Sequence, residues 1–276
     1  MRTVEFDGWP TPISALGFGC ASLGSRVSRK AGITAIERAL AAGVTWFDVA
    51  PSYGDGEAEA ILGDALAGTK VAIVTKVGLR AERASGLGKV LRSLARPVVA
   101  AVPGLRSAIK PKRAGAVQRL PLSGESIRSS VMRSLERLRV ERVAVLALHD
   151  PAEDDLRRDE VLCALDDVRR QGLAARIGVA GSYANFLVAN DANRAIDVAQ
   201  FAASPSPDYP AQVAALQGRG VFVVTHSVFA VGGEADPMRR CFEANPNGVV
   251  LASSFGAAHM SANAVAASER PAVLRG

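Results

Sequence analysis

Cysteine, histidine and aromatic residues are scarce in this chain of 276 residues. The three cysteines, Cys20, Cys163 and Cys241, lie far apart and are odd in number, so they indicate neither a disulfide framework nor a zinc site. No apolar run approaches the ~20 residues that span a bilayer, and the N-terminus lacks the apolar core of a signal peptide. These absences predict a reduced, cytoplasmic protein without a membrane partner.

Acidic residues are missing from one long stretch of a chain whose net charge is +6. No Asp or Glu lies between Arg83 and Gly124. The basic residues of this stretch are Lys89, Arg92, Arg96, Arg106, Lys110, Lys112, Arg113 and Arg119. Such a patch could attract nucleic acid, an anionic membrane or a phosphorylated ligand. Because no aromatic residues alternate with the basic ones, a stacking surface for single strands is not supported, and we interpret the stretch as a solvated insertion without a nucleic-acid partner.

Short apolar runs alternate with stretches of helical spacing along the whole chain. The predicted strands lie near 15–20, 44–48, 71–76, 143–148, 175–179, 196–200, 220–225 and 248–252. The predicted helices cover 31–42, 56–67, 125–138, 157–171, 183–190, 208–218, 235–244 and 257–268. Eight such pairs predict the α/β class, as one closed (β/α)8 TIM barrel over residues 1–276.

Two segments fall outside this alternation. Residues 3–13 read as a strand–turn–strand hairpin that would cover the bottom of the barrel. Residues 80–122 contain four prolines, which prevent one long helix, so we expect a long basic loop after the third strand.

Three ionisable residues close buried strands. Asp48, Lys76 and His149 each end an apolar, β-branched run, and Tyr53 follows five residues after Asp48. A charged group at such a position is costly unless it meets a partner or the rim of a site, and active sites of parallel barrels lie at the carboxyl ends of the strands. Taken singly, Asp48 and Lys76 could be a structural ion pair, and His149 a satisfied residue at a strand end.

Together the four residues suit proton transfer to a carbonyl or alcohol. A phenol titrates near 10, so Tyr53 needs a neighbouring cation to form phenolate at neutral pH. Lys76 can supply that cation, Asp48 can hold Lys76 in place, and His149 can donate to an oxygen between it and the phenol.

The segments around these residues resemble the aldo-keto reductase superfamily. The matching segments are Leu16–Ser22, Gly43–Gly54, Glu59–Leu66, Ile73–Gly78, Leu146–Pro151 and Gly172–Val179. The turn after Tyr53 and the His149-Asp150-Pro151 strand end are most similar to the sugar dehydrogenase branch, the fucose and threo-aldose dehydrogenases.

The resemblance implies hydride transfer between a nicotinamide cofactor and the carbonyl or alcohol of a small molecule such as an aldehyde, ketone or aldose. It implies that Tyr53 is the general acid, that Lys76 lowers its pKa, that Asp48 supports Lys76, and that His149 orients the substrate carbonyl. It also implies a set of cofactor-binding residues: Ala21, Ser22, Asp48, Gln200, His226, Ser227, Ser253, Ser254, Gly256, His259 and Asn263.

The cofactor motifs also depart from the family pattern. The usual Ser-Asn pair after the fifth strand is Ala180-Gly181, which deprives the carboxamide of two side-chain partners. The cations that often hold the 2′-phosphate become Ser253 and His259, and charge-assisted phosphate bonds are strong. We therefore expect NADP(H) or NAD(H), with NADP(H) slightly favoured. His226 and His259 could alternatively be loop and helix-start residues that meet no ligand.

Three other interpretations compete with this one. A dinucleotide site of the Rossmann type would need a third glycine after Gly17-Phe18-Gly19, where Ser22 stands. A metal-dependent hydrolase would need more histidines than the first strand offers, and we predict no metal. A regulatory barrel that binds nucleotide with little or no turnover is the remaining alternative, suggested by the altered cofactor positions. The sequence defines neither the substrate nor the oligomeric state.

Overall fold

The computed structural model describes residues 1–81, 117–203, 207–229 and 236–269 of the chain. Eight parallel strands of these residues form a closed barrel in the order β10-β11-β12-β3-β4-β5-β8-β9. The strands are β3 (Leu16–Gly19), β4 (Trp46–Asp48), β5 (Ala72–Val77), β8 (Val143–His149), β9 (Ala174–Ala180), β10 (Ile196–Ala202), β11 (Phe222–His226) and β12 (Val249–Ala252). The predicted (β/α)8 barrel is confirmed.

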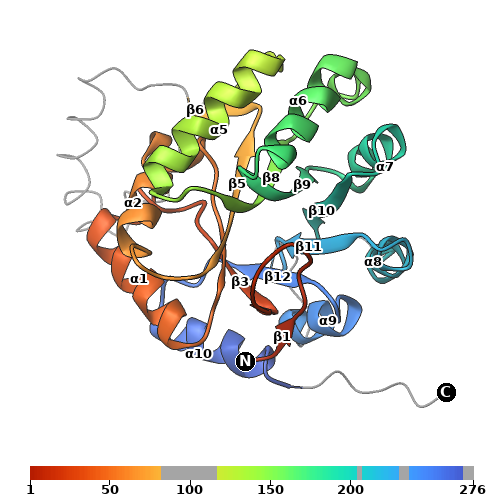
Figure 1. The fold of residues 1–276 in the computed structure, drawn as a ribbon. Coiled ribbons are helices and arrows are strands. Elements are labelled where there is room, and N and C mark those ends of the chain that lie inside the picture. Colours follow the sequence, from red (N-terminus) through yellow and green to blue (C-terminus); the bar gives the residue numbers. More distant parts are fainter. Residues whose placement is uncertain (82–116, 204–206, 230–235, 270–276) are drawn as a thin grey trace, which may run out of the picture.

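Helices surround the barrel, as Figure 1 shows. They are α1 (Arg29–Ala41), α2 (Ala58–Ala65), α5 (Gly124–Leu138), α6 (Asp159–Arg170), α7 (Tyr183–Ala192), α8 (Tyr209–Gln217), α9 (Pro237–Ala244) and α10 (Ala257–Ala266). No helix among the described residues combines the length and apolar character needed to cross a membrane.

Burial explains why the strands read as continuous apolar runs. All six residues of β5 are buried, and so are all residues of β8 except His149. One face of each strand lines the barrel interior and the other packs against a helix, as parallel sheets require. On α5, the apolar residues Ile127, Val131 and Leu138 are buried. Ser123 caps this helix by accepting a hydrogen bond from the Ser126 amide at 3.2 Å.

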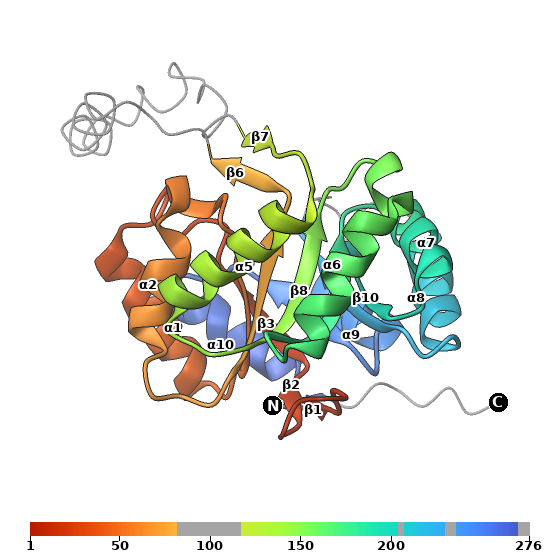
Figure 2. The ribbon, with the colours of Figure 1, turned by 45° about the horizontal axis from the view of Figure 1, so that its top comes forward.

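The N-terminal hairpin closes the end of the barrel at which the strands begin. β1 (Thr3–Val4) pairs with β2 (Ile13–Ser14) in antiparallel register. Between them, the Phe6 ring packs edge-on against Trp46 and Phe222, with centroid distances of 5.1 and 4.7 Å. Because Trp46 and Phe222 are the first residues of β4 and β11, this hairpin lies at the bottom, as predicted (Figure 2).

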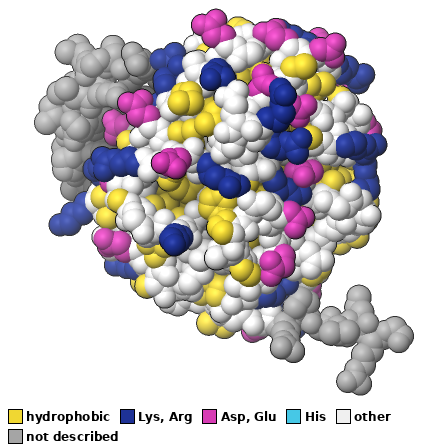
Figure 3. Space-filling model, in the orientation of Figure 1, with side chains coloured by type: hydrophobic (Ala, Val, Ile, Leu, Met, Phe, Trp, Pro, Cys, Tyr) yellow, Lys and Arg dark blue, Asp and Glu magenta, His cyan; other side chains and the backbone are white. Residues whose placement is uncertain are grey.

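The segment after the third barrel strand, predicted to be a long loop, begins and ends with a short strand. β6 (Leu79–Ala81) and β7 (Val117–Arg119) form an antiparallel ribbon at the end opposite the hairpin (Figure 2). Residues 117–119 are all exposed, so their pairing leaves no buried pattern for sequence reasoning to detect. Most of the basic stretch between Arg83 and Gly124 lies outside the described residues. On the described surface in the orientation of Figure 1, basic and acidic side chains are interspersed (Figure 3).

Helix starts show a second difference. Short 3-10 turns at Tyr53–Gly56 and Asp154–Arg157 precede α2 and α6, which begin two residues later than the predicted helices 56–67 and 157–171. The first of these turns carries Tyr53, which lies before the predicted helix.

Candidate active site

A cavity of about 990 Å³ opens at the carboxyl ends of the barrel strands. All four predicted catalytic residues, Asp48, Tyr53, Lys76 and His149, line it. The predicted cofactor residues that line it are Ala21, Gln200, His226, Ser227, Ser253, Ser254, His259 and Asn263. The structure therefore brings most of the predicted site together at one mouth of the barrel. The volume of this cavity lies at the upper end of the range for ligand cavities.

Lys76 and Asp48 form a buried ion pair at the floor of this cavity. The Lys76 Nζ donates to Asp48 Oδ1 at 2.7 Å and to the Val49 carbonyl oxygen at 3.1 Å. The two side chains are only 1% and 4% exposed. Lys76 stands one residue before the end of β5, since that strand continues to Val77. Burial lowers the pKa of the Lys76 ammonium, but attraction to Asp48 and to Tyr53 outweighs it, so the pKa is raised overall.

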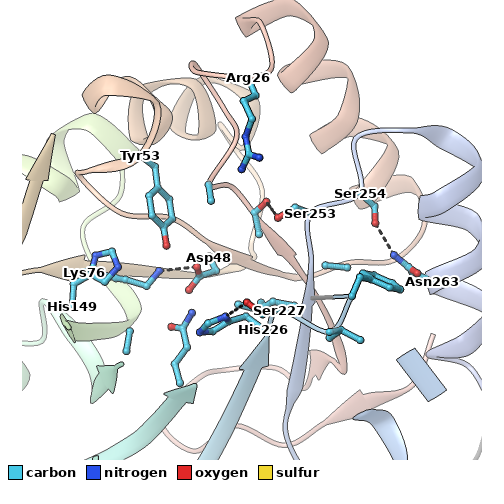
Figure 4. A pocket seen from close by; sticks show the side chains of 18 of the residues that line it. Arg26, Asp48, Tyr53, Lys76, His149, His226, Ser227, Ser253, Ser254 and Asn263 are labelled. Atoms are coloured by element: carbon cyan, nitrogen blue, oxygen red, sulfur yellow. Dashed lines mark hydrogen bonds and ion pairs between the residues drawn. The ribbon is translucent and has the colours of Figure 1, made fainter. Parts of the chain in front are cut away.

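Tyr53 reaches the ion pair from the turn after β4. Its ring lies with its centroid 5.0 Å from Lys76 Nζ, and Figure 4 shows its hydroxyl directed towards the Lys76 and Asp48 side chains. Gly54 makes this turn possible, because its φ is +60° and a Cβ there would lie 2.0 Å from the Leu23 carbonyl oxygen. The turn is therefore pressed backbone to backbone against the loop after β3.

The environment acts on the Tyr53 phenol in opposing directions. Burial raises its pKa, Lys76 lowers it, and Asp48 raises it again. Lys76 lowers the pKa of Tyr53, as the family resemblance implied, but burial outweighs this effect and the net pKa is raised above its ordinary value. At neutral pH Tyr53 is a protonated phenol, which is the form of an acid.

His149 lies beside the phenol as a neutral ring. The Tyr53 and His149 rings meet edge to face with centroids 5.8 Å apart. Burial, followed by the charge of Lys76, lowers the pKa of His149 to about 3. A neutral imidazole keeps one N–H, so His149 can donate to a carbonyl oxygen without carrying charge.

The cofactor-side residues lie on strand ends around the other half of the rim. Gln200 on β10 is paired in register with Ala180 on β9 and is buried. Ser253 donates to the Gly19 carbonyl oxygen at 2.9 Å, and Asn263 on α10 donates to Ser254 Oγ at 2.6 Å. These polar groups are already positioned by partners from the chain itself.

His226 and Ser227 form a contact of their own at the end of β11. The two side chains are 2.8 Å apart, between His226 Nδ1 and Ser227 Oγ (Figure 4). Burial lowers the pKa of His226, so its ring is neutral. Ser227 has a φ of +59°, a left-handed conformation that non-glycine residues seldom adopt and that concentrates at functional sites.

Two predicted cofactor residues do not line the cavity. The Ser22 carbonyl oxygen accepts a hydrogen bond from the Val27 amide at 3.0 Å, within the loop after β3. Gly256 is the N-cap of α10, and its carbonyl accepts from the Met260 amide. Their immediate neighbours Ala21 and Ser254 do line the cavity. Motif matching therefore located the right loops but not each lining residue.

Arg26, Asp150 and Phe229 are among the lining residues that the sequence did not predict as site residues. Asp150 follows His149 directly and adopts a φ of +51°, so a polar residue next to a predicted catalytic one was an available signal. Phe229 is an exposed large apolar side chain in the loop after β11. Arg26 lies in a polar loop without periodicity, and nothing in its surroundings marked it.

The buried ion pair generates a first prediction. Lys76→Met should lower the free energy of unfolding by about 3–5 kcal/mol, because Asp48 is left buried without its counter-charge. The double variant Lys76→Met/Asp48→Leu should recover most of that loss, since an apolar pair replaces the isolated charge. Urea denaturation of the three proteins measures both effects. Arg239→Met, which breaks the exposed pair with Glu243, is the control and should leave the transition unchanged. Wild-type stability of Lys76→Met would contradict the argument.

The neutral state of His149 generates a second prediction. In the unfolded chain this histidine takes up a proton below about pH 6.5, whereas in the folded chain it does so only near pH 3. Stability should therefore fall as pH drops through this range, by up to about 1.4 kcal/mol per pH unit from this group. Urea unfolding between pH 7 and 4 should show a weaker pH dependence for His149→Gln than for wild type. His259→Gln, at an exposed histidine, is the control. Parallel curves for wild type and His149→Gln would refute the assignment.

The sequence is similar to that of known proteins. The Aldo/keto reductase family model matches residues 15–233. A D-threo-aldose 1-dehydrogenase from a Pseudomonas species is 33% identical over 176 residues, which cover 60% of this chain and 50% of that protein. The chain spans about half the length of the curated relatives it matches.

Solved structures share the fold at lower identity. An aldo-keto reductase from Bacillus halodurans, in its holo form, superposes with a TM-score of 0.73 at 21% identity, covering 99% of this chain and 93% of that one. An aldo-keto reductase from Klebsiella pneumoniae in complex with NADPH gives a TM-score of 0.67 at 18% identity, covering 97% and 90%. By the match to its family model over most of its length, the chain belongs to the aldo-keto reductase family.

Proposed function

We propose that this protein is an NAD(P)-dependent oxidoreductase that interconverts a carbonyl and an alcohol on a small molecule. One observation carries the proposal. A phenol, a buried ammonium and a neutral imidazole meet at one end of a cavity large enough for a ligand of considerable size. These three proton-donating groups lie around one point. There they can serve a substrate oxygen that gains or loses a proton while its carbon changes oxidation state.

The chain's own residues fit a dinucleotide. The lining of the cavity extends from His149 on β8 to Asn263 on α10, so it is wider than a small carbonyl substrate requires. Gln200, Ser227, Ser254 and Asn263 would hold the cofactor by neutral hydrogen bonds. When bound, the nicotinamide supplies or accepts the hydride.

Each catalytic residue then has one task. In reduction, Tyr53 donates its hydroxyl proton to the carbonyl oxygen as negative charge develops there. His149 donates a hydrogen bond to the same oxygen and fixes its position. Lys76 stabilises the phenolate that remains, and Asp48 keeps Lys76 charged and in place. In oxidation the same phenolate accepts the proton of the alcohol.

Sugars are the substrate class that we favour. The Pseudomonas relative is named a D-threo-aldose 1-dehydrogenase, and the His149-Asp150-Pro151 strand end resembles the sugar dehydrogenase branch. The Klebsiella structure contains NADPH, while the family resemblance implies that Ser253 and His259 stand in place of cations, so we propose use of both nicotinamides. A single domain over residues 1–276, a cytoplasmic location and the lack of a nucleic-acid partner remain predictions.

Removal of the phenolic hydroxyl tests the chemistry. Tyr53→Phe should lower kcat by about 10²–10⁴-fold, because the proton donor is lost, while the affinity for nucleotide stays near the wild-type value. Tyr183→Phe is the matched control, since Tyr183 packs against Phe201 outside the cavity. The assay follows nicotinamide absorbance with a panel of aldehydes and aldoses. Near-wild-type turnover of Tyr53→Phe would rule out this role.

The same panel separates the proposal from a regulatory role. Turnover with any substrate supports the oxidoreductase. If nucleotide binds and no substrate is converted in either direction, the barrel acts as a nucleotide-binding regulator instead.

A separate prediction concerns cofactor preference. His259→Arg should raise the affinity for NADPH relative to NADH by about tenfold, because a charge-assisted bond to the 2′-phosphate is gained at the start of α10. His259→Gln should leave the ratio unchanged. Titration of both nucleotides with each variant measures it. An unchanged ratio in His259→Arg would mean that the 2′-phosphate lies elsewhere.

A further inference from the structure

Two charged side chains that line the cavity have no ion pair or side-chain hydrogen bond among the described residues. They are Arg26, in the loop after β3, and Asp150, after β8. The lining has two further lysine, arginine, aspartate or glutamate residues, Lys76 and Asp48, and these neutralise each other. Arg26 is therefore the one cation of the described lining whose charge is available to a ligand.

The loop that carries Arg26 is held by its own backbone. The Gly24 amide donates to the Val27 carbonyl oxygen at 3.0 Å, and the Val27 amide donates to the Ser22 carbonyl oxygen at 3.0 Å. Gly24 has a φ of +74°, and a Cβ there would lie 3.1 Å from the Gly54 carbonyl oxygen. The loop thus packs against the turn that carries Tyr53. The backbone that carries Arg26 is therefore held in place, which reduces the conformational entropy that this loop loses when Arg26 binds a ligand.

The two unpaired charges lie on different parts of the rim. β3, which leads to Arg26, is paired with β12, and Ser253 after β12 bonds to Gly19 at the end of β3. β8, which leads to Asp150, is paired with β5 and β9. Figure 4 shows the Arg26 side chain extending into the cavity near Ser253, away from His149. An anion is therefore favoured on the β12–β3 side and repelled on the β8 side.

We propose that Arg26 binds a phosphate group of the nicotinamide dinucleotide. This inference rests on the proposed function, which requires such a cofactor. A dinucleotide brings at least two negative charges into a cavity whose other described cation is already neutralised. The planar guanidinium donates two parallel hydrogen bonds to phosphate oxygens, which makes arginine well suited to this contact. The phosphate is either the diphosphate, common to both cofactors, or the 2′-phosphate of NADP(H).

The location also accounts for the departures in the cofactor motifs. Ser253 and His259 lie on the β12 side of the rim, at positions where the family resemblance implies cations. Arg26 approaches the same side from the neighbouring loop, so positive charge is supplied from a different element. The neutral serines of this side then need only to provide hydrogen bonds.

The experiment measures nucleotide binding to the full chain without substrate. NADH and NADPH are titrated by isothermal calorimetry into wild type, Arg26→Met, Arg26→Lys and Lys30→Met. Lys30 is exposed on the first turn of α1 and does not line the cavity, so it controls for the loss of one positive charge. Arg26→Met should weaken binding by about 10- to 100-fold, and Arg26→Lys less, because lysine keeps the charge without the fork. The melting temperature should be unchanged in all four proteins.

Each outcome has one meaning. Equal weakening for both nucleotides assigns Arg26 to the diphosphate, and weakening for NADPH alone assigns it to the 2′-phosphate. The wild-type affinity should also fall with added KCl more steeply than that of Arg26→Met. Unchanged affinities in Arg26→Met would overturn this inference and leave the proposed function intact. If wild type binds neither nucleotide, the proposed function fails together with it.

Discussion

The Lys76–Asp48 ion pair is the interaction on which the rest of the site depends. Two opposite charges almost wholly removed from water are costly, and only their close contact offsets the desolvation. β4 and β5 are neighbours in the barrel, with Asp48 in register with Val74, so adjacent strand ends bring the charges together. Burial is the main cause of the pKa shifts of Tyr53 and His149, and the Lys76 ammonium acts on both rings as well, lowering the pKa of each. Stability and chemistry therefore meet in the same two residues.

The two ends of the barrel differ: the lower end is closed and the upper end holds the cavity. At the bottom, the hairpin places Phe6 over Trp46 and Phe222, and the Arg176 guanidinium stacks on two of these rings while pairing with Asp197. That end is closed by aromatic rings and the guanidinium that stacks on them. At the top, small residues such as Gly19, Ala180 and Gly181 line a cavity. A closed lower end supports an open upper one, because the rim residues rest on a packed interior and keep their positions.

The sequence predicts the parts of this molecule that depend on burial. Continuous apolar runs such as Val143–His149 must be buried on both faces, and this alone leads to the barrel and to Asp48, Lys76 and His149 at one rim. The exposed ribbon Val117–Arg119 has no such pattern, because its pairing removes no apolar surface from water. Arg26 was missed for the same reason, being one polar residue in a polar loop. Ser22 and Gly256 were predicted as cofactor residues but do not line the cavity, because a shared motif fixes a loop but not the direction in which each of its residues faces.

The protonation states of the site bear on the direction of the reaction. At neutral pH the structure holds Tyr53 as a phenol and His149 as a neutral donor, which is the arrangement that reduction needs. Oxidation of a sugar, the reaction implied by the name of the Pseudomonas relative, needs phenolate instead. Lys76 favours that form, but burial and Asp48 oppose it. An oxidised nicotinamide ring carries positive charge and would add to the effect of Lys76, whereas a reduced ring would not. In the proposed reaction, the redox state of the cofactor and the proton affinity of Tyr53 would thus be coupled, so one set of residues could serve as acid in one direction and as base in the other.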